Sequence, residues 1–501
     1  MTHRGMQIST PVNAAMAAPA SSTGTAYQRR TIATNFLAMT LVSGVILLIG
    51  IFTTAYSRRA LGPAAIGQVN WNAALLAFLA LLASPGVATV GQRDIAANPG
   101  QTAPIAALVL GLQVLFSIAA YAAVAAITFF YPRSGQSGTL LLIQGLIVLV
   151  NAGSAAWVLQ AHQRMAGPAI ASLVLNVLQI PVLLALVHAP NDVFLFAAYT
   201  LPFSLALVAY NFWYLQHHDI LRFSELRLRL AGGAKLLAQV WPLALSQAAV
   251  LVIHNGGAIM LGFTHSDVEV GLYTTAYKLM YISTVVSGAM MSAYFPVLSQ
   301  VAGQPSEARR VAGDFATLMT WMGLPIAALG WACGGHVNDL LFGAQFTAAG
   351  PYFEWLCLVI GLTFVNIGLG APLLAWGHQK LHLKIIAFSS LVSLALAALL
   401  IPRYGGWGAV AALLLAETLS VAMLAIARHR LELGRNPLLP LLAPPLLCCT
   451  AVALGIANLP IVADRYWWVE LAIGTALLGA CLLLFERRIA RAAWTLMRRA
   501  R

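Results

Sequence analysis

Long apolar runs dominate this sequence and leave few folds open to it. A helix needs about 20 mostly apolar residues to cross the ~30 Å hydrocarbon core of a bilayer, and fourteen such stretches follow one another along the chain. Only 9% of the residues are charged, whereas about 25% are charged in a soluble domain. The chain is therefore predicted to be an all-α integral membrane protein. The expected spans are 31–56, 67–91, 103–129, 139–162, 167–187, 193–215, 235–262, 270–299, 311–332, 352–377, 383–401, 407–427, 437–459 and 466–485.

The distribution of lysine and arginine predicts the orientation of these spans. Cytoplasmic loops of membrane proteins carry an excess of the two residues. With the N-terminus inside, the inner segments hold 22 of the 28 and the outer loops hold five, while Lys278 lies within a span. We therefore expect a bacterial inner-membrane protein with both termini in the cytoplasm. The same bias explains the net charge of +13, so the charge does not indicate a nucleic-acid partner.

Two adjacent arginines are exceptions to this bias. Arg58 and Arg59, in the stretch YSRRALGPAAIG, fall at the outer end of the first span. Two interpretations are open. The side chains could extend to lipid phosphates at the membrane surface, or they could bind an anionic ligand.

The short loops and the absence of motifs argue against an enzyme. No loop between spans exceeds about twenty residues, and the sequence has no Walker A, HExxH or nucleophile-elbow pattern. The five cysteines have no CxxC spacing and are expected to be apolar packing residues. We therefore expect no catalytic residues, no metal and no cofactor.

A repeat links the two halves of the chain. Residues 61–79 (LGPAAIGQVNWNAALLAFL) and 265–283 (HSDVEVGLYTTAYKLMYIS) lie 204 positions apart, and in this register Gly67 matches Gly271. In both, a span ends, a short outer loop follows and a glycine opens the next span. Six spans separate the two segments, an even number, so the halves have the same orientation, as in the parallel repeats of some transporters. This predicts two six-helix lobes, with spans 13 and 14 as an addition.

Prolines within the spans predict bent helices around a central cavity. A proline leaves a carbonyl of its helix unpaired and bends the axis. The six prolines are Pro85, Pro181, Pro202, Pro242, Pro325 and Pro372. The expected organisation is a disordered cytoplasmic tail (1–30), an N-lobe (31–230), a C-lobe (231–430), helices 13 and 14 (431–487) and a basic cytoplasmic tail (488–501).

Ionisable residues inside the spans are candidate functional residues. A central charge costs about 2.5–3.5 kcal/mol on insertion scales, so such residues face the protein interior. Lys278 lies beside Tyr273 and Tyr277, and Glu417 lies midway along span 12. The two charges could form an ion pair that holds the bundle together, or Lys278 could belong to a cationic site with Glu417 as counter-ion or proton-coupling group. Further polar residues could line a sugar-binding cavity or join helices by hydrogen bonds: Asn70, Asn72, His254, Asn255 and Asn366.

Two segments resemble a known family. SRRALGPAAIGQVNWNAALLAFLALLASPGVATVGQRDIA (57–96) and LGFTHSDVEVGLYTTAYKLMYISTVVSGAMMSAYFPVLSQVA (261–302) are similar to the polysaccharide transporter family of Wzx-type flippases. This family belongs to the multidrug/oligosaccharidyl-lipid/polysaccharide exporter superfamily. The resemblance in helix number and repeat covers about residues 31–485.

The resemblance implies two lobes around a V-shaped cavity and a transport function. Such proteins move undecaprenyl-pyrophosphate-linked oligosaccharides from the inner to the outer leaflet by alternating access, for exopolysaccharide, O-antigen or capsule synthesis. The implied partners are this lipid-linked substrate, membrane lipids, and the polymerase and export machinery. Carried over by position, the basic residues for pyrophosphate or acidic sugars are Arg58, Arg59 and Lys278, with Tyr273 and Tyr277 beside them.

Three alternatives remain open from the sequence. A cation-coupled multidrug exporter would require acidic residues in the N-lobe spans, where Asp94 and Asp192 occur only at the edges. A flippase for a peptidoglycan precursor would have the same architecture. A glycan polymerase or ligase is disfavoured by the short loops.

Overall fold

The computed structural model describes residues 22–130, 135–222, 224, 226, 232–431, 438–457 and 467–485, and every regular element within these ranges is a helix. Eleven of the described helical segments are long and apolar enough to cross a membrane. The prediction of an all-α, multi-pass membrane protein is confirmed. Most of the expected tail 1–30 and all of the tail 488–501 lie outside the described residues, although α1 begins at Ser22.

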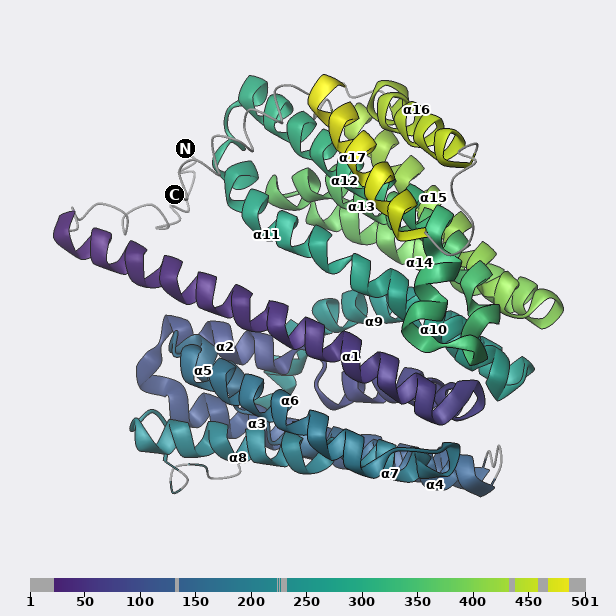
Figure 1. Ribbon diagram of the computed structural model, residues 1–501. Coiled ribbons are helices and arrows are strands. Elements are labelled where there is room, and N and C mark those ends of the chain that lie inside the picture. Colours follow the sequence, from purple (N-terminus) through teal and green to yellow (C-terminus); the bar gives the residue numbers. More distant parts are fainter. Residues whose placement is uncertain are drawn as a thin grey trace, which may run out of the picture.

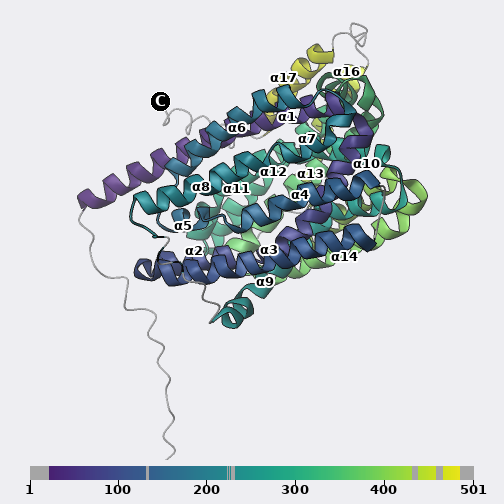
Figure 2. The same cartoon turned by 90° about the horizontal axis from the view of Figure 1, so that it is seen from below.

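The first helix, α1 (Ser22–Ala83), makes two membrane passes. A straight helix of 62 residues would be about 93 Å long at 1.5 Å per residue, roughly three times the thickness of the bilayer core. The backbone leaves helical geometry at Gly62, with φ 75° and ψ 173°, which glycine adopts without the clash of a Cβ. Figure 2 shows the ribbon of α1 turning back on itself. Arg58 and Arg59 therefore lie immediately before a reversal at the predicted outer end.

The number of spans agrees with the sequence prediction. Of the eleven segments, Gly44–Ala83 contains the break at Gly62 and counts as two passes. Two further apolar helices, α16 (Leu438–Ala457) and α17 (Trp467–Phe485), bring the described total to the fourteen expected.

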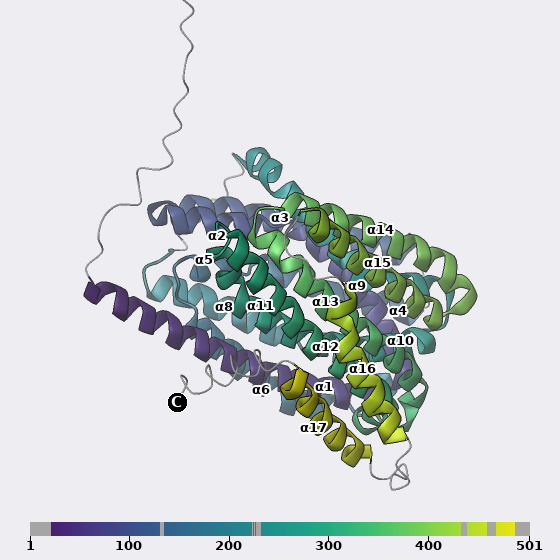
Figure 3. The same ribbon diagram turned by 90° about the horizontal axis from the view of Figure 1, so that it is seen from above.

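The helices form two groups, one from each half of the chain, with α1 running between them (Figure 1). The first group also contains α2 (Val87–Ala97), α3 (Thr102–Phe130), α4 (Gly135–Ala152), α5 (Ala156–Ala161), α6 (Ala166–Leu186), α7 (Val193–Ala198) and α8 (Leu201–His217). The second group contains α9 (Gly233–Thr264), α10 (Asp267–Ser283), α11 (Val285–Gln300), α12 (Pro305–Phe342), α13 (Gly350–Ala375), α14 (Gln379–Tyr404) and α15 (Gly406–Arg430). Helices α16 and α17 pack against α12 at the periphery (Figure 3).

The two groups meet where the second pass of α1 begins (residues 63–70) and packs against the start of α10 (residues 267–274). We call this contact the outer seam. A Cβ on Gly67 would overlap the carbonyl oxygen of Asp267, and a Cβ on Gly271 would overlap that of Pro63. Gly67 thus packs against Asp267, the counterpart of Pro63, and Gly271 packs against Pro63 itself. The two contacts are equivalent, as expected about a local two-fold axis. The repeat inferred from the sequence is confirmed by this symmetrical contact.

A hydrogen bond extends the same symmetry one turn further. Asn70 Nδ2 donates to Thr274 Oγ1 at 2.8 Å, and these residues are again 204 positions apart. The seam therefore joins equivalent turns of the two halves and brings their backbones closer than any side chain would allow.

The six prolines have two different effects. Pro85 lies between α1 and α2, so it separates two helices rather than bends one, whereas Pro202 lies in the first turn of α8. At Pro202 the backbone stays helical, because Tyr199 and Thr200 keep right-handed helical angles between α7 and α8, and only the hydrogen-bond ladder is interrupted. The other four lie inside helices as expected: Pro181, Pro242, Pro325 and Pro372.

Candidate functional site

A cavity of about 360 Å³ lies between the two groups beside the outer seam, and we call it the central pocket. Helices α1, α9 and α10 line it, and no aspartate or glutamate is among its described lining residues. The pocket brings together seven residues that the sequence singled out: Arg58, Asn70, His254, Asn255, Tyr273, Tyr277 and Lys278.

Arg58 is the buried cation of this pocket, with 6% of its surface exposed. Its Nε donates to Thr275 Oγ1 at 3.0 Å, its Nη1 donates to the Thr54 carbonyl at 3.4 Å, and its guanidinium carbon lies 5.3 Å from the centroid of the Phe342 ring. All three partners are neutral. Since a buried charge is costly without an opposite charge and a guanidinium has five N–H donors, this arrangement favours an anionic ligand.

Lys278 supplies a second positive charge. Its side chain is exposed to the pocket and forms no hydrogen bond or ion pair with any described residue. The alternative of a Lys278–Glu417 ion pair is wrong for the described structure, because Glu417 Oε2 instead accepts a hydrogen bond from Asn366 Nδ2 at 2.9 Å. Two cations and no carboxylate therefore face the same cavity.

A histidine–tyrosine contact separates the central pocket from a second cavity. His254 Nδ1 and the Tyr277 hydroxyl lie 2.6 Å apart, and the Tyr273 and Tyr277 ring centroids lie 6.0 Å apart. His254 and Tyr277 line both cavities, together with Val250 and Tyr281. Tyr277 and Tyr281 thus form part of a wall between two cavities, whereas Tyr273 lines the central pocket alone.

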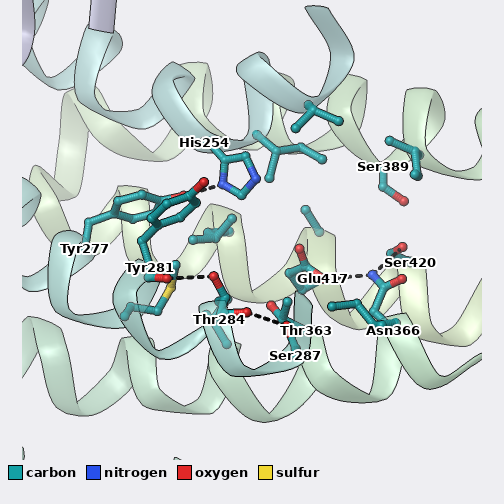
Figure 4. Close-up of a pocket in the computed structure, with 18 of the residues that line it drawn as sticks. His254, Tyr277, Tyr281, Thr284, Ser287, Thr363, Asn366, Ser389, Glu417 and Ser420 are labelled. Atoms are coloured by element: carbon teal, nitrogen blue, oxygen red, sulfur yellow. Dashed lines mark hydrogen bonds between the residues drawn. The ribbon is translucent and has the colours of Figure 1, made fainter. Parts of the chain in front are cut away.

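The second cavity, which we call the acidic pocket, has a volume of about 380 Å³ and lies within the C-terminal group. Figure 4 shows Glu417 and Asn366 side by side in the wall of this pocket, with Ser420 next to Asn366. Asn366 Nδ2 donates to both Glu417 Oε2 and Ser420 Oγ, each at 2.9 Å. The residue that could carry a proton therefore occupies a different cavity from the two cations.

Arg59 has a different role from its neighbour. Its Nε donates to the Leu341 carbonyl at 2.9 Å, and its Nη2 donates to the Leu340 carbonyl. These carbonyls belong to the last turn of α12, where a cation compensates unpaired acceptors and the negative end of the helix dipole. The structure therefore does not place Arg59 in the central pocket; it places it at a helix end.

Asn72 also lies outside the pocket. It is fully buried, and neither polar atom of its amide has a hydrogen-bond partner among the described residues. Conversely, the sequence did not reveal Thr275 and Phe342, which hold Arg58 in place, since their proximity depends on how α10 and α12 pack against α1.

Comparison with known proteins places the chain in a family. Residues 32–302, more than half of the chain, match the sequence profile of a family described as "Polysaccharide biosynthesis protein". The chain belongs to this family. A protein named "Putative O-antigen transporter" from Shigella dysenteriae is 23% identical over 390 residues, which cover 77% of this chain and 97% of that protein.

Solved structures share the fold. The "Lipid II flippase MurJ, inward closed conformation" has a TM-score of 0.73 at 12% identity and covers 91% of this chain and 100% of its own. An inward-facing multidrug resistance transporter of the MATE family and MOP superfamily has a TM-score of 0.58 at 16% identity and covers 77% of this chain and 94% of its own. At these identities the likeness concerns the fold alone, and it agrees with the fold that the sequence resemblance implies.

Proposed function

We propose that this protein is a flippase that moves polyprenyl-pyrophosphate-linked oligosaccharides from the inner to the outer leaflet by alternating access. The observation that carries the proposal is the pair of cations, Arg58 and Lys278, in a carboxylate-free pocket between two symmetry-related groups. The name of the Shigella dysenteriae relative supports the polysaccharide cargo. We further propose an inner-membrane location with both termini in the cytoplasm, from the distribution of Lys and Arg.

A pyrophosphate matches the chemistry of the central pocket. Arginine binds phosphate oxygens through two parallel N–H bonds, whereas lysine acts as a point charge. Water competes poorly within a membrane-embedded cavity, so each charge attracts an anion more strongly there than in bulk water. A cationic drug would meet two like charges in this pocket.

Alternating access is supported by the arrangement of the two groups. The outer seam closes the central pocket at the predicted outer end, so substrate would enter from the cytoplasmic side while the seam is formed. Opening would require the two halves to move apart at the seam, away from the local two-fold axis. Packed interfaces of this kind change between discrete arrangements rather than deform continuously.

A variant series at Lys278 tests the proposal. In proteoliposomes that contain a polyprenyl-pyrophosphate-linked glycan, Lys278→Ala is expected to slow flipping about tenfold, since one charge-assisted contact contributes roughly 1.5 kcal/mol. Lys278→Arg should keep most of the rate. Lys235→Ala is the matched control, because Lys235 is exposed near the start of α9. Equal rates for Lys278→Ala and the control would contradict the proposal.

We also propose that Glu417 couples transport to protons. Glu417 lines the acidic pocket together with His254 and Tyr277, and these two residues also line the central pocket. A change of charge on Glu417 would therefore act on the wall that the two pockets share. Glu417→Gln should flip at a rate that no longer responds to an imposed pH gradient, with substrate affinity within about threefold of wild type. Glu307→Gln is the control, because Glu307 lies in the first turn of α12 and pairs with Arg310 away from both pockets; it should respond normally. A normal pH response in Glu417→Gln would exclude this coupling role.

A further inference from the structure

A third cavity lies within the N-terminal group, and we call it the neutral pocket. Its volume is about 370 Å³, and the second pass of α1, helix α4 and the α7–α8 junction line it. No charged side chain is among its described lining residues. Four residues give it polar character: Gln144, Asn151, Tyr199 and Thr200.

Most of these polar groups are free to bind a ligand. Gln144 Nε2 donates to the Val69 carbonyl at 3.3 Å. In contrast, the side chains of Asn151, Tyr199 and Thr200 form no hydrogen bond with any described residue. Unpaired donors and acceptors are costly at membrane depth unless water or a ligand reaches them. An amide and two hydroxyls therefore face a cavity that needs a hydrogen-bonding occupant.

The helical hydrogen-bond pattern is also interrupted on both sides of this cavity. Asn151 is the last residue but one of α4, which ends at Ala152, and α5 begins only at Ala156. Helix α7 ends at Ala198 and α8 begins at Leu201, and Pro202 has no N–H to donate to the Ala198 carbonyl. Backbone groups that such interruptions leave unpaired are tolerated at this depth where they line a cavity, and broken helices mark the substrate sites of several transporters.

Two aromatic rings complete the pocket. The Phe196 and Tyr199 rings are stacked, with centroids 5.5 Å apart and planes 24° apart. Sugars combine hydroxyl groups, which both donate and accept hydrogen bonds, with apolar C–H faces that pack on aromatic rings. Amide and hydroxyl side chains beside an aromatic pair match that combination, and a lipid tail would leave the polar groups unpaired.

The neutral pocket adjoins the central pocket. Ala73 on α1 lines both cavities, and Ala77 and Ala80 continue the wall of the neutral pocket along the same helix. A ligand whose phosphates contact Arg58 and Lys278 could therefore place its covalently attached sugars in the neutral pocket.

We propose that the neutral pocket is a saccharide subsite, which binds the uncharged sugars next to the pyrophosphate of the transported lipid. This inference rests on the proposed function. Asn151 and Thr200 bond the sugar hydroxyl or acetamido groups, Tyr199 adds a hydroxyl, and the Phe196–Tyr199 pair packs on a sugar face. Because no cation lines the pocket, it selects neutral sugars over uronic acids at these positions.

Two lipid probes test the subsite. The full chain in lipid nanodiscs is titrated with polyprenyl pyrophosphate and with the same lipid carrying a neutral oligosaccharide. Wild type should bind the glycosylated lipid at least tenfold more tightly, which corresponds to about 1.4 kcal/mol. Asn151→Leu and Tyr199→Phe should each remove a large part of that difference and leave the affinity for the bare lipid unchanged. Asn176→Leu on α6 is the control, since Asn176 bonds to the Ser172 carbonyl of its own helix.

The outcomes separate the subsite from the proposed function. If wild type binds both lipids equally, or if the two variants weaken both lipids to the same extent, the subsite is wrong and the phosphate site stands. If wild type binds neither lipid, the proposed function itself fails.

Discussion

Neutralising Arg58 should slow transport by about two orders of magnitude, whereas neutralising Arg59 should leave transport within about twofold of wild type. Arg58 lies in the central pocket with only neutral partners, so Arg58→Gln removes a charge that no other group replaces. Losing a buried charge-assisted contact to a phosphate costs roughly 3 kcal/mol. Arg59 bonds carbonyls at the end of α12, so Arg59→Gln should lower stability by about 1 kcal/mol or less.

The two variants are each other's control, since they differ by one position on the same helix. Flipping in proteoliposomes measures transport, and thermal unfolding in detergent measures stability. Arg58→Lys should recover part of the rate, because lysine keeps the charge and loses the bidentate geometry. Equal loss of transport in Arg58→Gln and Arg59→Gln would contradict the assignment of Arg58 to the substrate.

The topology could be predicted from the sequence because the bilayer sets a length that each span must meet. Fourteen apolar stretches and a glycine pair at a 204-residue offset were sufficient to predict the helices and their repeat. Lys278 could also be predicted as a pocket residue, since an intramembrane charge that faces lipid is costly.

The direction in which a helical residue points could not be predicted in the same way. Arg58 and Arg59 are identical neighbours, but successive residues on a helix point about 100° apart, and only the position of α12 decides that Arg59 caps its end. Asn70 and Asn72 differ for the same reason: one reaches Thr274, and the other is fully buried. The partner of Glu417 likewise depends on the rotation of α13, which brings Asn366 to it.

The neutral pocket was missed although part of its signal was visible. The sequence predicts a bend at Pro202 in one apolar span, and Gly153 and Ser154 lie between α4 and α5 in another. That the two interruptions flank one cavity depends on the packing of α4 against α7, which a single sequence does not encode in any local pattern. Asn151 and Tyr199 were therefore not distinguished from other polar residues of the spans.

Adding one methyl group at the outer seam should stop transport. A Cβ on Gly67 would overlap the Asp267 carbonyl oxygen, and a Cβ on Gly271 would overlap that of Pro63. In both cases the obstacle is backbone, which cannot change rotamer to make room, and tightly packed interiors do not absorb an added group without displacement. Gly67→Ala and Gly271→Ala should therefore hold the two groups apart at the predicted outer end.

Such variants should leave the central pocket open to the outside and fail to complete the transport cycle. The test uses Thr274→Cys in a chain whose five native cysteines are replaced. This cysteine should react with an impermeant maleimide from outside faster in a chain that carries Gly67→Ala or Gly271→Ala than in a chain that keeps both glycines. Gly50→Ala, on the first pass of α1, is the matched control, since its added methyl has no atom within 4 Å. Because Gly67 and Gly271 occupy equivalent places about the two-fold axis, both variants should show the same phenotype. Normal transport in either would mean that closing this seam is not a step of the cycle.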